Sequence, residues 1–519
     1  MKRYIAAIDA GTGGVRCVLY DAGGRAVGRD YRELLTRYTP DGRAEQDPVQ
    51  LVRSAWDAVR GALVRSGIDS ANVAGLSVTG VQTSFVPVDR DGNFLTPLLL
   101  WQDLRGTEMF GWMRGRLAEA GMDEAALYRR TLRPLDGILA GAKLLWLRAH
   151  APGVYRLIHR LLNPQAVLLR AFGAEEPTLD VTDAGWWLCQ DAVSLATDAE
   201  LAAVFDVDPG LMPPLRRPGE QVGEVGADAA ARTGLRRGTP LFQGAVDQCC
   251  AALGAGNAGE SGLGTLCMGT VGLLMTWSET PVPDPRGRYY VIHYPTGGFA
   301  SELTLPAAAS AFRWVRDMLW PAGAFERGDV YRRMDAEAER APIGAGGVAF
   351  LPHLAGCVYP EMNAAARGGW IGASMGTTRA ELVRAALEGI AFGMRQVIGA
   401  GGGCRRLRLL GGAARSELWN GMQADIYNCP VETVEADEAS ALGAAMIAAA
   451  GAGLYADLPE AVRAMTRVKR RYEPDPVRAA SYEESYAAWL ACAEALSPQA
   501  FEMLAGVRER GRGIRGTRE

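Results

Sequence analysis

The chain has 519 residues, of which 48% are hydrophobic and 22% are charged, and its formal net charge is -4. This length exceeds what a single hydrophobic core organises, so at least two domains are expected. The balanced charge excludes the strongly basic surface that is typical of nucleic-acid-binding proteins and favours a small neutral or anionic ligand.

The nine cysteines and four histidines form no metal-binding or redox pattern. No two cysteines have C-x-x-C spacing, so we expect buried thiols in a reducing compartment. No segment approaches the roughly 18 uninterrupted apolar residues of a membrane span, and the first residues lead directly into a strand. We therefore expect a cytoplasmic protein without a signal peptide or a membrane partner.

Residues 4–30 predict three strands joined by two turns, the first of which is the glycine-rich segment 11–14. A plain hairpin is one interpretation. The other depends on Asp9, a carboxylate at the end of an apolar strand, where burial without a partner would be costly. In that interpretation the turn's N–H groups and the Thr12 hydroxyl cradle a phosphate, and Asp9 holds Mg²⁺ through water.

A helix over residues 45–63 is predicted from Asp47 as N-cap and Pro48 at the first helical position. A strand at residues 73–78 follows, and Asp91-Gly92 predicts a hairpin turn. The cluster at residues 101–105, WQDLR, places an aromatic ring beside polar groups. Because sugar C–H faces stack on tryptophan while hydroxyls need polar partners, this cluster is a candidate wall for a polyol.

Further along, a helix is predicted at residues 139–150 and another at residues 154–172, interrupted by Pro164. Residues 182–187, TDAGWW, predict a loop that covers packed aromatic side chains.

The segment 241–256, LFQGAVDQCCAALGAG, is an apolar strand that ends near Asp247 and continues as a helix of small residues. One interpretation makes Asp247 a helix N-cap. The other makes it a general base that acts on a hydroxyl at the edge of a cleft between the two halves of the chain.

The second half repeats the order of elements predicted at the N-terminus. Residues 262–277 read as strand, Gly269-Thr270 turn and strand, which suggests two copies of one fold. A helix is predicted at residues 306–320, and a capping box at residues 378–381 opens another helix.

A strand at residues 407–410 leads into the Gly411-Gly412 turn, and a helix starts at Ser416, an arrangement in which a nucleotide can approach the backbone. The small residues of segment 438–450 predict a helix that packs closely on its neighbour or on the ligand. The Arg/Gly-rich tail is expected to be disordered.

Taken in order, these motifs resemble those of the FGGY carbohydrate kinases from Tyr4 to about Tyr472. They are DAGTGGVR at 9–16, EQDP at 45–48, WQDLR at 101–105, AVDQ at 245–248, MGT at 268–270, GGAARSELW at 411–419 and ALGAA at 441–445. The resemblance implies two α/β domains of the ribonuclease H-like, actin-like ATPase fold that flank a catalytic cleft. It implies an N-terminal sugar-binding domain with the first phosphate loop at 1–250 and an ATP-binding domain at 251–500. The composition of residues 501–519 predicts a basic, disordered tail after these domains.

The resemblance also implies a role for each candidate residue in phosphoryl transfer from ATP to a sugar or polyol. Asp247 would be the general base, and Asp9 would hold Mg²⁺ through water. The substrate would contact Gln82, Thr83, Trp101, Asp103, Asp247 and Gln248. ATP would contact Thr12, Gly13, Arg16, Gly269, Thr270, Gly411, Gly412, Ala413 and Ser416. The partner is thus a small molecule, not nucleic acid or membrane, and a homodimer is left open.

Departures from the family bear on the substrate. Glycerol kinases have Arg-Glu where this chain has Gln82-Thr83, and a tyrosine at Ile138, whereas xylulokinases have Met-His at the first pair. Residues 137–148 and 411–419 are closer to xylulokinases, which favours a ketopentose such as D-xylulose. Glycerol, erythritol, ribulose and an autoinducer-type signal molecule are the alternatives. From a different class, an actin-like ATPase assembly module is also considered, although Trp101 and Asp247-Gln248 weigh against it.

Overall fold

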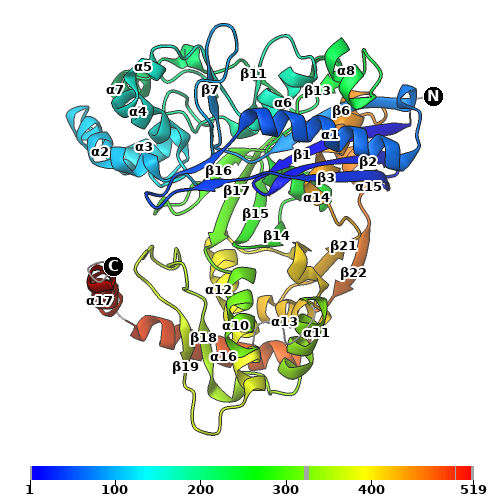
Figure 1. Ribbon diagram of the computed structural model, residues 1–519. Coiled ribbons are helices and arrows are strands. Elements are labelled where there is room, and N and C mark those ends of the chain that lie inside the picture. Colours follow the sequence, from blue (N-terminus) through cyan, green and yellow to red (C-terminus); the bar gives the residue numbers. More distant parts are fainter. Residues whose placement is uncertain (1–2, 321–326, 497, 516–519) are drawn as a thin grey trace. The chain divides into compact units, whose positions relative to one another are not determined.

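The computed structural model describes residues 3–320, 327–496 and 498–515 (Figure 1). The chain forms two compact units. The first unit contains residues up to 261 together with 277–301 and 436–467, and the second contains residues 262–276, 302–435 and those from 468 onward.

The elements of the first unit are the strands β1 (Tyr4–Gly11), β2 (Gly14–Asp21), β3 (Ala26–Glu33), β4 (Arg37–Tyr38), β5 (Ala44–Gln46), β6 (Val73–Gly80), β7 (Val86–Val88), β8 (Leu98–Leu99), β9 (Arg160–Leu162), β10 (Leu179–Asp180), β11 (Leu215–Arg216), β12 (Gln221–Glu224), β13 (Pro240–Phe242) and β16 (Tyr290–His293). Its helices are α1 (Pro48–Ser66), α2 (Phe110–Glu119), α3 (Glu124–Thr131), α4 (Ala140–His150), α5 (Pro152–Tyr155), α6 (Pro164–Phe172), α7 (Ala199–Phe205), α8 (Ala227–Thr233), α9 (Asp247–Gly254), α14 (Ala439–Gly451) and α15 (Leu458–Met465).

The second unit contains the strands β14 (Leu263–Met268), β15 (Gly272–Ser278), β17 (Phe299–Leu305), β18 (Ala349–Leu351), β19 (Gly369–Ile371), β20 (Arg406–Leu410), β21 (Val431–Val434) and β22 (Val468–Tyr472), with the ends of β15 and β17 assigned to the first unit. Its helices are α10 (Ala309–Leu319), α11 (Arg327–Ala338), α12 (Arg379–Ala400), α13 (Glu417–Tyr427), α16 (Pro476–Ala495) and α17 (Pro498–Arg515).

The central sheet of the first unit has the strand order β12-β13-β6-β1-β2-β3. β1 pairs with β2 antiparallel and with β6 parallel, and β6 pairs with β13 parallel. Helix α1 packs on β2 and β3, while α14 packs on β1 and β6 (Figure 1). Every residue of β6 is buried, as expected for a parallel strand covered by helices. The carboxyl ends of β1, β6 and β13 therefore meet at one edge of the sheet.

The small-residue helix predicted at 438–450 is confirmed as α14, and its close neighbour is α9. A Cβ atom on Gly443 would lie 1.9 Å from the Cys250 carbonyl oxygen, and one on Gly254 would lie 2.0 Å from the Ala439 carbonyl oxygen. Only glycine fits at such close approaches. This packing places residues 436–467 in the first compact unit, so the compact units and the predicted ranges 1–250 and 251–500 have different boundaries.

The predicted echo of the N-terminal hairpin is present in the second unit. There β17, β15, β14, β20, β21 and β22 are neighbours in this order. β14 pairs with β15 antiparallel and with β20 parallel, and β20 pairs with β21 parallel, which repeats the pattern of β1, β2, β6 and β13. The predicted capping box is also confirmed, because Thr378 and Glu381 cap α12 reciprocally.

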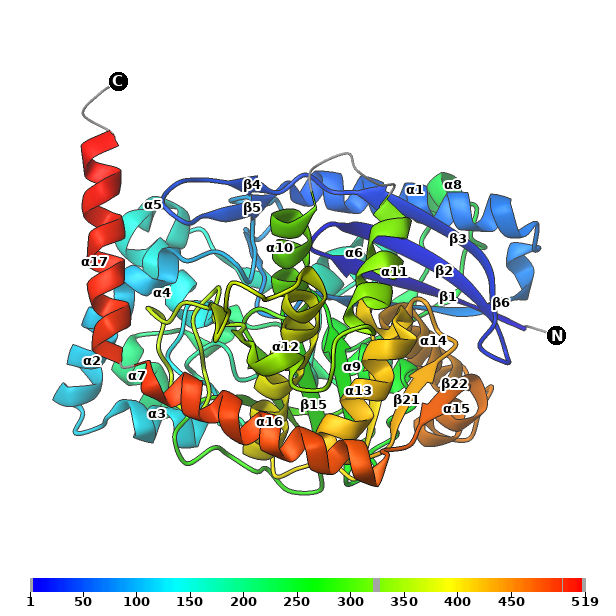
Figure 2. The ribbon, with the colours of Figure 1, turned by 90° about the horizontal axis from the view of Figure 1, so that it is seen from below.

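Two predicted elements differ from the structure. The helix predicted at 154–172 is interrupted at Pro164 as predicted, but residues 156–163 are not helical and contain strand β9 between α5 and α6. Pro164 occupies the first turn of α6, and the Asn163 side chain caps it. The tail expected to be disordered from residue 501 is helical as far as Arg515 in α17, which Figure 2 shows as a separate helix after α16. Its alanine, glutamate, methionine and arginine residues favour a helix, and its glycines do not prevent one. The last four residues of the tail lie outside the described residues.

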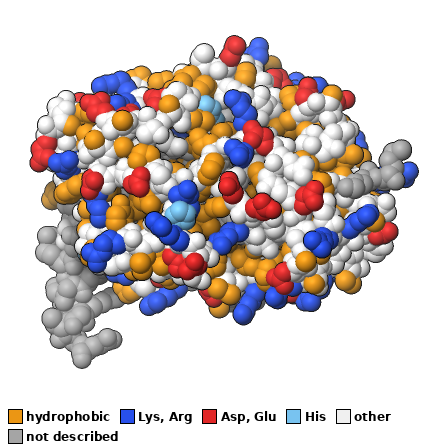
Figure 3. All heavy atoms as spheres, turned by 90° about the horizontal axis from the view of Figure 1, so that it is seen from above, with side chains coloured by type: hydrophobic (Ala, Val, Ile, Leu, Met, Phe, Trp, Pro, Cys, Tyr) orange, Lys and Arg blue, Asp and Glu red, His pale blue; other side chains and the backbone are white. Residues whose placement is uncertain are grey.

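Within the described ranges, no helix combines the length and apolar character needed to cross a membrane. Acidic and basic side chains are interspersed on the face of the molecule shown in Figure 3, in keeping with the small net charge.

Candidate active site

Asp247 lies at the predicted junction of strand and helix, as the first residue of α9. The N-cap interpretation is off by one residue, because the extended backbone of Val246 places that residue at the cap. The Asp247 carboxylate accepts a hydrogen bond from the Gln248 N–H, at 2.9 Å. Both residues are partly exposed, whereas Ala245 and Val246 are buried. The helix thus begins where the side chain can leave the core.

The backbone before Asp247 is fixed against the end of β6. The Thr79 hydroxyl donates to the Ala245 carbonyl at 2.8 Å, and Gly80 forms a β-bridge with Val246. A Cβ atom on Gly244 would lie 1.9 Å from the Val78 carbonyl oxygen, so the close approach needs glycine. Since Asp9 pairs with Thr79 in the sheet register, Asp247 and Asp9 lie at the same edge of the sheet.

Asp9 is part of a cluster with Arg16 and Glu438. The Arg16 guanidinium lies 2.5 Å from the Glu438 carboxylate and 3.9 Å from the Asp9 carboxylate. Burial raises the pKa of Asp9 to about 6; Arg16 opposes this shift and Glu438 adds to it. Glu438 is 422 positions from Arg16 in sequence and carries no local signal, so only the packing of α14 on β1 identifies it.

The turn of the first hairpin, Thr12-Gly13, is held by side chains from three other segments. The Trp101 indole N–H donates to the Thr12 hydroxyl at 3.0 Å, and the Gln46 amide donates to the Thr12 carbonyl at 2.7 Å. The Tyr31 hydroxyl donates to the Gly13 carbonyl at 2.7 Å. The predicted phosphate turn is therefore joined directly to the predicted sugar wall through Trp101.

Of the residues predicted for the sugar wall, Gln82, Thr83 and Trp101 are adjacent in space. The Ser84 hydroxyl accepts from the Trp101 backbone N–H at 2.9 Å. Thr83 has a positive φ of 56° and donates its N–H to the Asp183 carboxylate at 3.1 Å. A threonine in this strained conformation is held there by the surrounding structure, as is common at binding sites.

Asp103, which is predicted to contact the substrate, is fully buried in the structure. Its side chain has no exposed surface and accepts hydrogen bonds from the Arg105 guanidinium at 2.7 Å and from the Ala44 N–H at 2.9 Å. A buried carboxylate whose oxygens are occupied in this way supports the backbone of the wall. Sequence reasoning missed this role because the partner Ala44 is far away in the chain.

Several buried polar residues near the wall were not predicted. Asp183 also accepts from the Asn163 amide at 2.9 Å, and burial together with Asp180 raises the pKa of Asp183 to about 7. The Tyr290 hydroxyl donates to Asp136, and burial raises the pKa of Asp136 to about 6. Asp183 belongs to the TDAGWW segment, so the sequence did contain a signal for this region. The two tryptophans of the segment are buried as predicted.

The second unit brings together its own hairpin turn and the Gly411 turn. The carbonyls of Gly269 and Thr270 accept from the N–H groups of Ala309 and Ala308 at the start of α10, at 3.0 and 3.2 Å. Gly411 has a φ of 86°, and a Cβ atom there would lie 3.0 Å from the Met268 carbonyl oxygen.

Ser416 starts a helix as predicted. It is the N-cap of α13, with its hydroxyl accepting from the Trp419 N–H at 3.1 Å. Gly412 and Ala413 lie in the short 3-10 turn Gly412–Arg415 that leads into this cap. Gly412 is exposed, and a Cβ atom placed on it would have no neighbouring atom within 4 Å. The backbone is thus open at this turn.

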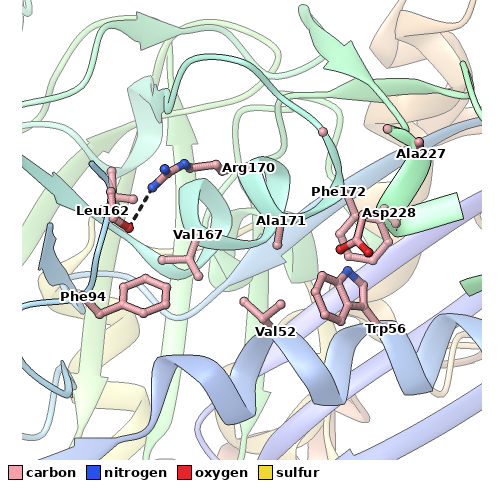
Figure 4. A pocket seen from close by; sticks show the side chains of 14 residues that line it. Val52, Trp56, Phe94, Leu162, Val167, Arg170, Ala171, Phe172, Ala227 and Asp228 are labelled. Carbon is pink, nitrogen blue, oxygen red and sulfur yellow. Dashed lines mark hydrogen bonds between the residues drawn. The ribbon is translucent and has the colours of Figure 1, made fainter. Parts of the chain in front are cut away.

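The hollow in Figure 4 has a volume of about 510 Å³ and lies away from these residues. Val52 and Trp56 of α1 face Val167 and Ala171 of α6 across it. It contains none of the predicted site residues.

Two units with the same strand order, each with a glycine-containing turn between its first two strands, define the ribonuclease H-like, actin-like ATPase fold. Models of the FGGY family of carbohydrate kinases match this chain, the N-terminal domain over residues 4–254 and the C-terminal domain over residues 264–452. The chain belongs to this family and is an ATP-dependent carbohydrate kinase.

Three comparisons illustrate the range of relatives. The xylulose kinase of Bacillus subtilis (strain 168) is 27% identical over 490 residues, covering 93% of this chain and 95% of the relative. The glycerol kinase of Alkalilimnicola ehrlichii is 30% identical over 492 residues, covering 90% and 94%. The crystal structure of xylulose kinase from Rhodospirillum rubrum has a TM-score of 0.86 at 29% identity and covers 96% of this chain and 100% of that chain. The family is therefore shown, while the names of the relatives differ in substrate.

Proposed function

We propose that this kinase phosphorylates a hydroxyl of a ketopentose such as D-xylulose, with Asp247 as the general base. The observation that carries the proposal is the position of Asp247, which is partly exposed at the start of α9 and at the same sheet edge as Asp9 and the first hairpin. A carboxylate in such a position can accept the proton of the attacking hydroxyl.

The chemical step is in-line transfer of the γ-phosphoryl group, in which positioning and neutralisation of charge dominate catalysis. The Asp247 carboxylate takes the proton as the sugar oxygen attacks. Thr79 and Gly80 fix the backbone directly before Asp247. This restricts the positions that the carboxylate can take, which favours a near-attack geometry. Gln248, the next residue of α9, is assigned to a second hydroxyl of the sugar.

The residues at the first hairpin fit a Mg²⁺ site. In the part of the chain that the structure describes, no three acidic, histidine or cysteine side chains gather as a metal cage. Mg²⁺ at nucleotide sites, however, is commonly held by one or two carboxylates, water and the phosphates. Asp9 and Glu438 both lie near Arg16, and their two carboxylates supply this kind of donor set. When bound, Mg²⁺ would neutralise phosphate charge, and Asp9 would hold it through water.

ATP is assigned to groups in both units. Thr12, Gly13 and Arg16 are proposed to contact phosphates from the first unit, and Gly269 and Thr270 from the second. The adenosine is assigned to the backbone of Gly411, Gly412, Ala413 and Ser416, which is supported by the exposed turn that leads into the N-terminus of α13.

Gln82 and Thr83 weigh against glycerol, and the ketopentose assignment rests on the likeness of residues 137–148 and 411–419 to xylulokinases. A glycerol-kinase-type site would have an arginine and a glutamate here, and this chain has two neutral side chains. Trp101 supplies a ring against which the C–H face of a sugar can stack. The glycerol kinase relative at 30% identity makes glycerol the alternative to test first.

The test is the initial rate of ADP release with ATP, Mg²⁺ and one of D-xylulose, ribulose, erythritol, glycerol or gluconate. The proposal expects the highest kcat/KM with D-xylulose. A higher kcat/KM with glycerol or erythritol would replace the ketopentose by a polyol. Equal release with no sugar would instead support an ATPase assembly module.

A further inference from the structure

Lys143 is a buried cation in the apolar first two turns of a helix. It lies in α4, where residues 140–147 are all buried, and its side chain has no exposed surface. The chain has 55 lysines and arginines, of which only Lys2, Lys143 and Lys469 are lysines. Burial of a charged group is costly unless it makes specific contacts, so the contacts of this ammonium group indicate its role.

The ammonium group joins two separate segments of the chain. Its nitrogen donates to the Thr83 carbonyl at 3.0 Å and to the Leu100 carbonyl at 2.8 Å. Thr83 is itself a predicted wall residue, and Leu100 directly precedes Trp101. Lys143 therefore adds a side-chain clamp between two segments that the Phe85–Leu99 bridge and the Ser84–Trp101 hydrogen bond also join.

This link extends to the phosphate turn. Trp101, whose position follows from that of Leu100, donates its indole N–H to the Thr12 hydroxyl. A shift of the segment at residue 100 would thus move both the ring proposed to stack on the sugar and the donor that holds Thr12. Nothing in this chain of contacts requires Lys143 to touch the substrate.

The charges around Lys143 are Asp103, Arg105, Asp136 and Asp183. Burial lowers the pKa of Lys143 to about 7, although the three carboxylates oppose this shift. The amine is therefore cationic below about pH 7 and largely neutral above it. A neutral amine is a weaker donor than an ammonium group, so the two hydrogen bonds weaken as the pH rises through this range.

We propose that Lys143 is a positioning residue for the sugar site, which sets sugar affinity by clamping the carbonyls of Thr83 and Leu100. This inference rests on the proposed placement of the sugar against Thr83 and Trp101. It goes beyond that placement by assigning the affinity to a residue that lies behind the wall.

The test compares Lys143→Met, which keeps the length of the side chain and removes the donors, with Lys469→Met on the exposed strand β22. The sugar is D-xylulose or, if another compound has the highest kcat/KM in the panel, that compound. A different best sugar thus revises the proposed function and leaves this test intact. The expected result for Lys143→Met is a 10-fold to 100-fold rise in sugar KM, with the ATP KM within about 2-fold of wild type. Lys469→Met should match wild type in both.

A pH series supplies a readout that a purely structural role would not change. The wild-type sugar KM should rise between about pH 6 and 8.5. Because Asp136 and Asp183 titrate in or near this range, the relevant quantity is the ratio of sugar KM between Lys143→Met and wild type, which should fall as the pH rises. A sugar KM within 2-fold of wild type in a folded Lys143→Met protein, or an equal rise in ATP KM, would overturn the proposal. If that variant does not fold, Lys143→Gln, which keeps an uncharged donor that does not titrate, takes its place: a ratio of sugar KM to wild type that falls as the pH rises supports the proposal, and a constant ratio overturns it.

Discussion

The two hairpins share a strand pattern and differ in what holds their turns. The turn at Thr12-Gly13 is fixed by side chains of Trp101, Gln46 and Tyr31, so it is coupled to the sugar wall. The turn at Gly269-Thr270 is fixed mainly by backbone N–H groups at the start of α10. The comparison teaches that one repeated element can serve two tasks. Under the proposed assignment, the first turn responds to both substrates and the second responds to ATP alone.

The largest expected effect is on kcat and follows from substitution of Asp247, because this residue of the first unit is the proposed general base. Asp247→Asn should lower kcat by about 10²-fold to 10⁴-fold while ATP affinity and the unfolding temperature stay near wild type, since the amide cannot accept the proton. Steady-state kinetics and nucleotide binding check this. Asp228→Asn on the exposed side of α8 is the control. Turnover near wild type in folded Asp247→Asn would exclude Asp247 as the base.

The second expected effect is on the free energy of unfolding. One glycine substitution in a helix of each unit is compared. Gly443→Ala should lower the free energy of unfolding by about 1–3 kcal/mol, because the new Cβ would lie 1.9 Å from the Cys250 carbonyl oxygen between α14 and α9. The matched variant Gly421→Ala in α13 has no atom within 4 Å and should gain about 0.5–1 kcal/mol. Denaturant unfolding measures both. Equal changes would show that the close contact between α14 and α9 is not important for stability.

The third prediction separates the two turns directly. Thr270→Val should raise the ATP KM about tenfold and leave the sugar KM nearly unchanged, because the hydroxyl is assigned to a phosphate. Thr12→Val should raise both KM values, since it also removes the acceptor for the Trp101 indole. The two constants are measured for each variant with the same sugar. If Thr12→Val affects only ATP, the turn is not coupled to the sugar wall.

The smallest expected effect is a shift in the acid limb of the pH profile, which is the pH range in which kcat/KM for ATP falls as the pH drops. Asp9 must be ionised to hold a cation, so kcat/KM for ATP should fall as the pH drops below about 6, where Asp9 becomes protonated. Arg16 lowers the pKa of Asp9, so Arg16→Gln should move the limb to higher pH by less than about one unit. Glu438 raises this pKa, so Glu438→Gln should move the limb to lower pH.

The midpoint of each pH profile, rather than its height, checks the shifts at Asp9, because Arg16 is assigned to a phosphate and Glu438 holds Arg16. Shifts of the same sign in the two variants would contradict the assignment of the limb to Asp9.

Local signals predicted the elements that depend on nearby residues. The hairpin at residues 11–14, the cap at Asp47, the capping box at Thr378 and the helix start at Ser416 each follow from a few consecutive residues. The contacts that the sequence did not reveal join distant segments. Examples are the Arg16–Glu438 ion pair, the two carbonyls bound by Lys143, and the buried carboxylate of Asp103 on Ala44.

Two differences between the predictions and the structure have the same origin. Asp103 was assigned to the sugar because an exposed and a buried carboxylate look alike in sequence, and only the fold decides which has partners. Residues 436–467 were assigned to the second domain because they follow it in the chain, whereas the glycines of α14 and α9 let this segment pack in the first unit.

The most direct test of sugar-dependent transfer follows the γ-phosphoryl group itself. The enzyme is incubated with γ-labelled ATP and Mg²⁺, with and without D-xylulose. The amounts of labelled sugar phosphate and labelled inorganic phosphate are then measured. The account predicts label in a sugar phosphate with D-xylulose and little release without it. Release of labelled inorganic phosphate at the same rate in both samples would contradict the account.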